Sequence, residues 1–151
     1  MKIEGKYTFK GPIEVVYDML QDPDALAKAM PGTKELKLIS EDVYEAEVGV
    51  KIGPIKGSYA GTVSVKDSVR PTHFRLIVEG KGAAGFLKGE GTIDLEEDGS
   101  DKTLIKYGGE TQVGGRIAQV GQRLVQSVAR KMISRGFKSL EKELKQRQTA
   151  A

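Results

Sequence analysis

The sequence predicts an α+β fold in which a curved antiparallel sheet of about seven strands wraps around one long C-terminal helix. Between residues 33 and 113, apolar and polar side chains alternate in short runs separated by turn residues, as in neighbouring strands joined by tight connections. From residue 117 to 144, apolar side chains recur at intervals of three and four, which is typical of an amphipathic helix. Because this helix is the one long element able to cover the apolar face of the sheet, the sequence favours a helix-grip architecture.

The first elements are a strand and two short helices. Residues 2–9 alternate between polar and apolar, which predicts a half-buried strand. A helix begins near Pro12, which suits a first turn, and its apolar residues continue to Leu20. Asp22 caps a second short helix over residues 23–29.

Six strands follow in the middle of the chain. Short connections between successive strands are typical of an antiparallel meander. The clearest alternating runs cover residues 44–52, 55–66, 74–78, 87–95 and 105–113, and turns fall at 31–32, 53–54, 70–71, 82–85 and 97–100. A single amphipathic helix from about Gly115 to Gln146 completes the order. We expect one domain over residues 1–147, followed by a short flexible tail at 148–151.

Composition excludes several kinds of site. The chain has no cysteine, so it forms no disulfide, thiolate metal site or cysteine nucleophile. A single histidine, His73, is too few for the common zinc sites, and no metal is expected. No apolar run is long enough to span a membrane and no secretion signal precedes the first strand, so a cytoplasmic location is expected. No catalytic motif is present, and no catalytic residue is assigned.

The stretch EGKGAAGF at residues 79–86 carries the G-x-G-x-x-G spacing of a dinucleotide-binding turn. That spacing binds a pyrophosphate only when a strand precedes it and a helix follows it. Here the following residues alternate as a strand and include Gly89 and Gly91, which a helix tolerates poorly. The sequence therefore predicts a β-hairpin connection at 82–85 and no nucleotide site.

Glycines also occupy positions that alternation assigns to the core-facing side of the sheet and to the facing helix. Such positions either leave an apolar cavity for a ligand or allow the sheet to bend, and both interpretations stay open. The cavity-forming candidates are Gly57, Gly61, Gly89, Gly91, Gly109 and Gly121.

The charge is unevenly distributed along the chain. From Arg116 onward there are nine Lys or Arg and two Glu, a net charge of +7, whereas residues 1–115 carry a net charge of −4. A basic terminal helix indicates an anionic partner or, alternatively, a solvated helix face. No stacking platform accompanies it, so nucleic acid is not expected. The candidate membrane or partner contacts are Arg123, Arg130, Lys131, Arg135 and Lys138.

A set of motifs runs in one order along nearly the whole chain: Gly5-x-Tyr-x-Phe9 with Pro12, LQDP at 20–23, Met30-Pro31-Gly32, VKIGPIKG at 50–57, GKGAAGF at 80–86 and VGGRIAQVGQR at 113–123. By this set the chain resembles the CoxG family of carbon monoxide dehydrogenase subunits. That family is a branch of the START-like (SRPBCC) superfamily of polyketide cyclases and lipid-transport proteins.

The resemblance implies a hydrophobic pocket between sheet and helix in an accessory protein that is not an enzyme. It implies a partner of the molybdenum hydroxylase type, a quinone or lipid ligand in place of any covalently bound cofactor, and peripheral contact with the cytoplasmic membrane. Many members continue into a membrane-associating tail, whereas this sequence stops at Ala151, so the basic helix is the membrane signal in view.

The candidate ligand-binding residues are Tyr59, Phe74, Leu76, Leu87, Ile93, Tyr107, Val120, Leu124 and Val128. The hairpin residues Gly82, Gly85 and Phe86 are candidates for a gate. Two alternatives remain: a cyclase or dehydratase that uses Tyr59 and Tyr107 inside the same cavity, and an assembly factor whose core is filled.

Overall fold

A computed structural model describes residues 1–29, 33–52, 55–83, 85–99 and 101–150. The elements, in chain order, are β1 (Lys2–Phe9), α1 (Ile13–Leu20), α2 (Pro23–Ala29), β2 (Thr33–Ser40), β3 (Val43–Ile52), β4 (Ile55–Val69), β5 (His73–Gly82), β6 (Gly85–Glu97), β7 (Thr103–Gly114), α3 (Arg116–Gln119) and α4 (Gln122–Ala150). The predicted order of one strand, two short helices, six strands and a terminal helix is confirmed.

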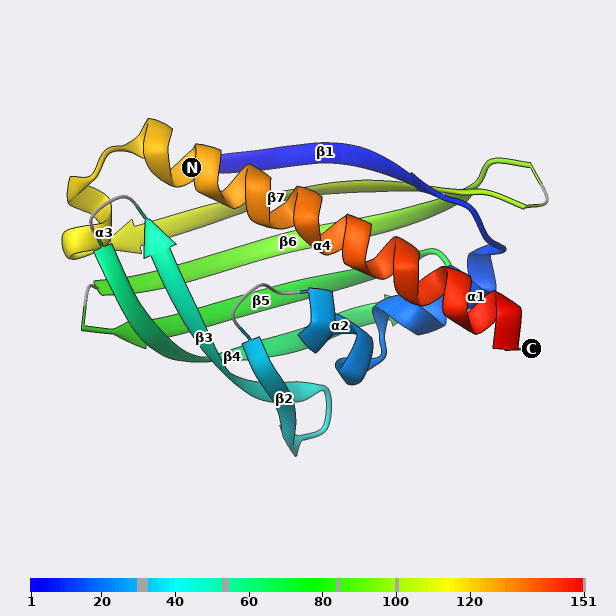
Figure 1. Ribbon diagram of the computed structural model, residues 1–151, viewed down its shortest axis with the longest axis horizontal. Helices are drawn as coiled ribbons and strands as arrows, with labels where there is room; N and C mark the ends of the chain where they lie inside the picture. Colours follow the sequence, from blue (N-terminus) through cyan, green and yellow to red (C-terminus); the bar gives the residue numbers. More distant parts are fainter. Residues whose placement is uncertain (30–32, 53–54, 84, 100, 151) are drawn as a thin grey trace.

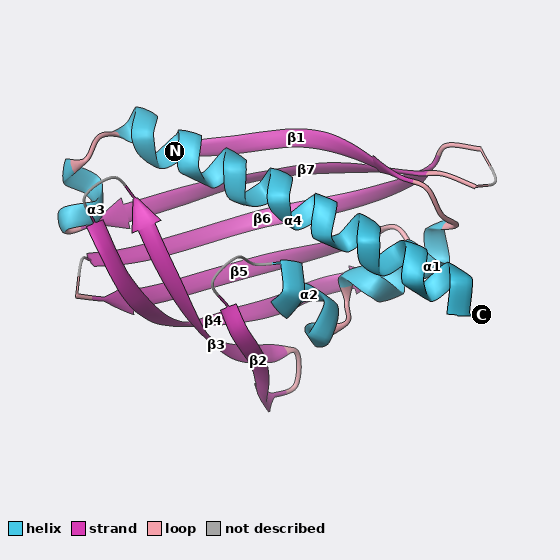
Figure 2. Cartoon of the chain, viewed as in Figure 1, coloured by secondary structure: helices cyan, strands magenta, loops and turns pink. Residues whose placement is uncertain are grey.

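The seven strands form one antiparallel sheet in the order β1-β7-β6-β5-β4-β3-β2. Strands β2 to β7 are therefore a simple meander, and β1 adds to its last strand. Figures 1 and 2 show the long helix α4 crossing one face of this curved sheet, with α1 and α2 near its C-terminal end and α3 near its N-terminal end. The predicted helix-grip architecture is confirmed.

The terminal helical segment differs from the prediction of one unbroken helix. It is divided into the short helix α3 and the long helix α4, because Gly121 adopts a φ of 99° that no α-helix contains. Such a positive φ favours glycine, which has no Cβ to clash. The helix α4 also continues to Ala150, and the Gln148 side chain donates a hydrogen bond to the Lys10 carbonyl oxygen at 3.1 Å. Helical structure therefore extends past the boundary expected at residue 147.

The sequence signals near the N-terminus predicted the two short helices correctly. The helices α1 and α2 have the expected bounds, and Asp22 Oδ1 accepts a hydrogen bond from the Asp24 backbone N–H at 3.0 Å. The connection between β5 and β6 is the predicted hairpin, although Ala84 lies outside the described residues. The turns expected at 31–32 and 53–54, and Ser100 of the turn at 97–100, also lie outside them.

The hydrophobic core is concentrated at one end of the molecule. A large cluster of buried side chains joins α1, α2 and the C-terminal part of α4 to the sheet, and includes Phe9, Met19, Phe74, Ile105 and Leu144. A second and much smaller cluster lies where α3 and the start of α4 meet the sheet. Its buried members are Tyr59, Ile117 and Val125. We refer to these as the dense cluster and the thin cluster.

Ion pairs also join elements at the dense end. Arg147 of α4 pairs with Asp22 before α2, and Lys28 of α2 lies 3.6 Å from Glu143 of α4. At Gly136, α4 approaches α2 so closely that an added Cβ would lie 3.0 Å from the Ala29 carbonyl oxygen. The dense end is therefore fixed by packing and charge together.

Candidate functional site

The strand register places the predicted core-facing glycines on the face covered by α4. Gly61 of β4 pairs directly with Gly80 of β5, and Gly91 of β6 pairs directly with Gly109 of β7. Tyr59 and Val63, which flank Gly61 on the same face, are buried, which identifies this face as the inner one. Two glycine–glycine cross-strand pairs therefore lie on the inner face, at positions where a packed sheet would carry large apolar side chains.

Close approach of neighbouring strands accounts for two of these glycines. A Cβ added to Gly61 would collide with the Glu79 carbonyl oxygen, and one added to Gly109 would lie 2.5 Å from the Glu90 carbonyl oxygen. These two glycines let neighbouring strands approach closely in a strongly curved sheet. Gly57 has no atom within 4 Å of its added Cβ, so open space adjoins it instead.

Two apolar side chains at the centre of the inner face are not fully buried. Val78 of β5 and Leu87 of β6 lie on central strands, yet both remain partly exposed. Neither belongs to the dense or the thin cluster, nor packs against one. The predicted ligand-binding residue Leu87 therefore lies in the interval between the two clusters.

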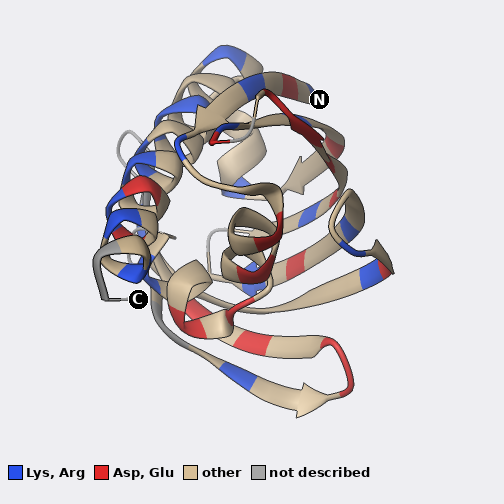
Figure 3. Cartoon of the chain, turned by 90° about the vertical axis from the view of Figure 1, so that its right-hand side faces the viewer, with Lys and Arg blue, Asp and Glu red and all other residues tan. Residues whose placement is uncertain are grey.

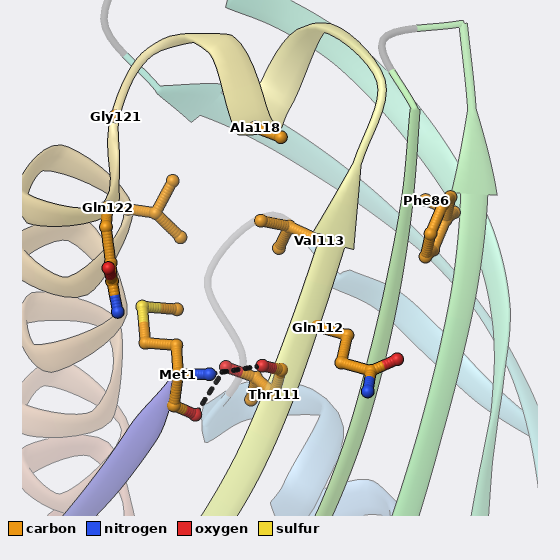
Figure 4. Close-up of a pocket in the computed structure, with 9 residues that line it drawn as sticks. Met1, Phe86, Thr111, Gln112, Val113, Ala118, Gly121 and Gln122 are labelled. Carbon is orange, nitrogen blue, oxygen red and sulfur yellow. Dashed lines mark hydrogen bonds between the residues drawn. The ribbon is translucent and has the colours of Figure 1, made fainter.

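A cavity of about 490 Å³ opens beside the thin cluster (Figure 4). It forms because β1 begins at Lys2, opposite Glu110, whereas β7 continues to Gly114. Met1 extends the pairing by one residue, since its ammonium group donates to the Thr111 carbonyl oxygen at 2.8 Å. The corner between α3 and α4 borders the remaining space on one side. The lining residues are Met1, Phe86, Thr111, Gln112, Val113, Ala118, Gly121, Gln122 and Val125.

The cavity and the thin cluster share walls. Val125 is buried in the thin cluster, and Met1 and Val113 pack against that cluster while also lining the cavity. Figure 4 shows Met1, Val113 and Ala118 turned toward a common space, with Gly121 at the corner above it. A molecule in this cavity would therefore contact the side chains that surround Tyr59.

Tyr59 is the polar residue of the thin cluster. It is 7% exposed, and its hydroxyl oxygen is buried without a hydrogen-bond partner within the described part of the chain. The ring lies against Gly82 of β5, where an added Cβ would stand 2.9 Å from a ring carbon. Burial raises the pKa of the Tyr59 hydroxyl, and the positive charge of Arg116 on α3 opposes that rise. The hydroxyl is therefore desolvated and lies within the electrostatic influence of Arg116.

Eight of the nine predicted ligand-binding residues divide between the two clusters, and Leu87 belongs to neither. Phe74 is 1% exposed and belongs to the dense cluster, against which Leu76, Ile93 and Tyr107 pack. Tyr59, Val120, Leu124 and Val128 belong to the thin cluster or pack against it. None of the nine lines the cavity at Met1, whereas the predicted cavity glycine Gly121 and gate residue Phe86 do.

The hairpin residue Phe86 faces outward. Its cross-strand partners are Lys81 and Gly114, and its ring occupies the place that a Cβ on Gly114 would take. It remains 40% exposed. Figure 4 shows Phe86 standing apart from the group formed by Met1, Val113 and Ala118. Phe86 therefore lies at the outer rim of the cavity.

Sequence reasoning missed Met1, Thr111, Gln112, Val113, Ala118, Gln122 and Val125 as lining residues. Their location depends on the register between the first and last strands, which no local pattern contains. The one available signal was the number of glycines around α3. Gly115 and Gly121 both have positive φ values, of 77° and 99°, and together they create the corner above the cavity.

The two tyrosines of the cyclase alternative are not brought together. Tyr107, the second tyrosine of the cyclase alternative, packs on the dense cluster with its ring 5.3 Å from that of Phe137. His73 Nδ1 lies 2.7 Å from Asp94 Oδ1 on the outer face of the sheet. Within the described ranges no group of three or more His, Asp or Glu could hold a metal ion.

The basic residues predicted as contacts all face solvent. Arg123, Arg130, Lys131, Arg135 and Lys138 are exposed on α4. None of the five forms an ion pair with another described residue. Figure 3 shows Lys and Arg recurring along α4. None of the helices described is long and apolar enough to cross a membrane.

Comparisons with known proteins agree on fold and family. The chain matches the model of the family described as the CoxG subunit of carbon monoxide dehydrogenase over residues 5–145. It is similar to the crystal structure of a conserved protein from Geobacillus kaustophilus, with 38% identity, coverage of 97% of this chain and 96% of that chain, and a TM-score of 0.93. No curated protein matches the chain.

More distant structures share the fold alone. A START superfamily protein from Mycobacterium smegmatis has 16% identity and a TM-score of 0.69, with coverage of 96% of this chain and 97% of that one. The Zhui aromatase/cyclase from Streptomyces sp. R1128 has 12% identity and a TM-score of 0.67, with coverage of 97% and 94%. The fold is therefore START-like.

Proposed function

Because the chain belongs to the CoxG family of carbon monoxide dehydrogenase subunits, we propose that it is a non-catalytic carrier of a lipophilic small molecule, a quinone or a lipid. The observation that supports this most is the uneven interior, in which buried side chains are many around α1 and α2 and few around α3. A cavity of about 490 Å³ falls within the range of small-molecule sites.

The affinity would come from burial of apolar ligand surface. Such burial contributes about 25 cal/mol per Å², reduced by the loss of freedom on binding. The cavity lining combines apolar side chains, including Met1, Val113 and Val125, with the polar side chains of Thr111, Gln112 and Gln122. The apolar side chains favour a hydrocarbon body over a charged metabolite.

The cyclase alternative receives less support from the geometry. The Zhui aromatase/cyclase shares only the fold with this chain, and a fold alone does not transfer an activity. Tyr59 and Tyr107 belong to different clusters, so they do not converge on one substrate position. Turnover that is lost in Tyr59→Phe while ligand binding is retained would support that alternative.

We further propose that the cavity end faces an anionic membrane surface. The segments 56–58, 81–88 and 112–123 contain five Lys or Arg and no Asp or Glu. Those five, namely Lys56, Lys81, Lys88, Arg116 and Arg123, are exposed and form no ion pair with another described residue. The exposed ring of Phe86 lies beside Lys81. Basic groups around an apolar side chain favour the interface of an anionic bilayer.

The accessory role rests on family membership. A molybdenum hydroxylase-type dehydrogenase is the proposed partner, and the exposed basic residues of α4 supply a surface for it. The test is co-elution of this protein with a molybdenum-containing dehydrogenase from its own host, with molybdenum measured in the shared fraction. Co-elution that survives moderate salt would support the assignment, whereas a consistently molybdenum-free fraction would contradict it.

The carrier function is tested by native mass spectrometry of protein extracted gently from its own host, followed by melting of the purified protein with added quinones. We expect a lipophilic species to co-purify and the melting temperature to rise with quinone concentration, since a ligand that binds only the folded state stabilises it. The proposal is wrong if nothing lipophilic co-purifies and no quinone raises the melting temperature.

A further inference from the structure

The strand β1 forms one edge of the sheet, and half of its backbone groups point away from the sheet (Figure 2). The Met1 ammonium donates to the Thr111 carbonyl oxygen, and the Thr111 N–H donates to the Met1 carbonyl oxygen, both at 2.8 Å. Such doubly bonded pairs recur at every second residue of an antiparallel ladder. The odd-numbered residues of β1 therefore bond to β7, and the even-numbered residues direct their N–H and C=O groups outward.

The outward groups are capped at the two ends of β1 but not in its middle. The Gln126 side chain of α4 donates to the Lys2 carbonyl oxygen at 3.3 Å, and the Gln148 side chain donates to the carbonyl oxygen of Lys10, just after β1, at 3.1 Å. The outward groups that have no hydrogen-bond partner within the described part of the chain belong to Glu4, Lys6 and Thr8. The open part of this edge is therefore the middle of the strand.

The two edges of the sheet differ in regularity. The strand β1 pairs with β7 without interruption over all eight of its residues, whereas the pairing of β2 with β3 contains two register shifts. Irregular pairing twists an edge strand and hinders the addition of a further strand, while a regular edge permits it. Of the two edges, β1 is therefore the one suited to pair with another strand.

The charges on β1 alternate in sign, which indicates the kind of partner. Lys2, Glu4 and Lys6 are exposed, and neither Glu4 nor Lys6 forms an ion pair with another described residue. On β7, Gly108 lies opposite Glu4 and Lys106 lies opposite Lys6, so neither faces an opposite charge. An edge with charges of one sign repels a second copy of itself, whereas alternating signs allow attraction in a suitable register.

One register of two antiparallel β1 strands uses these features together. With a two-fold axis at Gly5, Glu4 of each copy lies opposite Lys6 of the other, and both residues belong to the outward, hydrogen-bonding set. The same register sets Ile3 opposite Tyr7, which are partly buried apolar residues. At the axis, Gly5 of one copy meets Gly5 of the other in a non-hydrogen-bonded pair, where side chains would approach most closely.

The neighbouring registers are repulsive. An axis at Glu4 would set Glu4 against Glu4 and Lys2 against Lys6, and an axis at Lys6 would set two lysines against each other. An axis nearer the end of β1 leaves fewer residues to pair. The charges and the glycine therefore specify the alignment about Gly5.

We propose that this protein forms a symmetric dimer in which two β1 strands pair antiparallel about Gly5 and join two sheets into one. The interaction surface is the open edge of β1, and its partner is a second copy of this chain. This inference does not depend on the carrier function. Because one pair of strands makes the contact, the interface is small and the dimer should be weak and reversible.

Sedimentation equilibrium tests the proposal by measuring the average mass of the full chain as its concentration rises to about 1 mM. We expect the wild type to pass from monomer to dimer. Glu4→Lys alone and Lys6→Glu alone should each weaken the dimer about fivefold or more, because two attractive charge pairs become repulsive. An equimolar mixture of these two variants should associate like the wild type, since every lysine then faces a glutamate. The double variant with both changes should do the same.

The control is Leu38→Lys on the opposite edge, where Leu38 is 64% exposed on β2. This change should leave the dimer unaltered, and circular dichroism checks that every variant is folded. A wild type that stays monomeric up to the highest concentration would overturn the inference. Association that is lost in Leu38→Lys and kept in Lys6→Glu would also overturn it, as would failure of the mixture and of the double variant to restore the dimer.

Discussion

Gly61 and Gly80 are direct partners across β4 and β5, yet the space beside their α-carbons differs sharply. An added Cβ on Gly61 would collide with the Glu79 carbonyl oxygen, whereas one on Gly80 would meet only the Ala60 carbonyl oxygen, at 3.9 Å. One glycine of the pair is required by the curvature of the sheet, and the other leaves the interior open.

Because of this difference, substitution by alanine should lower the free energy of unfolding much more at Gly61 than at Gly80. Gly61→Ala should lower the free energy of unfolding by about 1–3 kcal/mol, because the neighbouring strand must move to admit the methyl group. Gly80→Ala should change it by less than about 0.5 kcal/mol. Urea unfolding of both variants measures the difference. Equal losses at the two positions would contradict the assignment of Gly80 to open space.

A larger side chain at Gly80 should compete with the ligand. Gly80→Leu places an isobutyl group beside Leu87 on the inner face, where it would occupy the interval between the two clusters. We expect quinone affinity to fall at least about tenfold while the protein remains folded, since the added Cβ meets no close contact. The measurement is calorimetric titration with circular dichroism as the check on folding.

The matched control for that variant is Gly108→Leu. Gly108 lies on the opposite face of the sheet, and its added Cβ would meet Glu4 Cβ at an ordinary 3.6 Å. Binding by this control should equal that of the wild type. A loss of affinity in both variants would show that leucine at a strand glycine acts through general distortion rather than by filling the interior.

The pair formed by Asp18 and Arg70 predicts a small dependence of stability on pH. Two hydrogen bonds of 2.9 Å from Arg70 hold the pKa of the Asp18 carboxyl below its ordinary value. Because the folded-state pKa is the lower one, the pair stabilises the protein at neutral pH, and the contribution is lost as the pH falls below about 4. Both side chains are about half exposed, which limits the contribution to at most about 1 kcal/mol.

Asp18→Asn should therefore lower the free energy of unfolding by less than about 1 kcal/mol at pH 7, with the difference narrowing steadily below about pH 4. Urea unfolding across this range provides the measurement, with Asp101→Asn, an exposed residue before β7, as the control. A difference that stays constant at acid pH would show that Asp18 stabilises the fold by something other than its charge.

If the cavity end contacts the membrane, substitutions at that end should weaken binding to anionic vesicles. The double variant Lys81→Glu with Phe86→Ser should weaken sedimentation with vesicles that contain anionic lipid, because it removes a cation and an apolar side chain from one exposed site. Each basic residue near a charged bilayer contributes about 1 kcal/mol, so the loss should exceed about fivefold and shrink as salt is raised.

The control for that experiment is the pair Arg130→Glu and Lys131→Glu on the exposed side of α4. If the cavity end makes the contact, this pair should affect sedimentation less than the change at Lys81 and Phe86. The reverse order would place the membrane on the helix face. Equal binding of all variants to neutral vesicles would show that the anionic lipid is not what they recognise.

The strands were predictable because side chains alternate with a period of two wherever a sheet has one apolar face. The break at Gly121 was not, because Ile117, Val120 and Leu124 keep helical spacing across it. The spacing of apolar residues shows which side chains face the core, but it does not reveal a single residue with a positive φ. The apolar spacing therefore stays helical across Gly121, although the backbone turns there between α3 and α4.

The sequence predicted an apolar cavity between sheet and helix, whereas the cavity that the structure shows opens at Met1 and is lined by none of the predicted ligand-binding residues. Alternation identified the inner face and its glycines, since those depend on local order. The opening at Met1 depends on the point at which β1 begins opposite β7, a relation between residues more than 100 positions apart. The strand register cannot be read from the sequence. It shows that β7 continues beyond the start of β1, so that Val113 lines the cavity.

The concentration of buried side chains around α1, α2 and the C-terminal part of α4 divides the molecule into regions of unequal local stability. Backbone amides in the dense end should exchange with solvent only when the whole domain unfolds, whereas those of α3 and the start of α4 have few buried contacts to break. Under the proposed carrier function, opening of the thin end alone would admit and release the ligand while the rest of the domain stays folded.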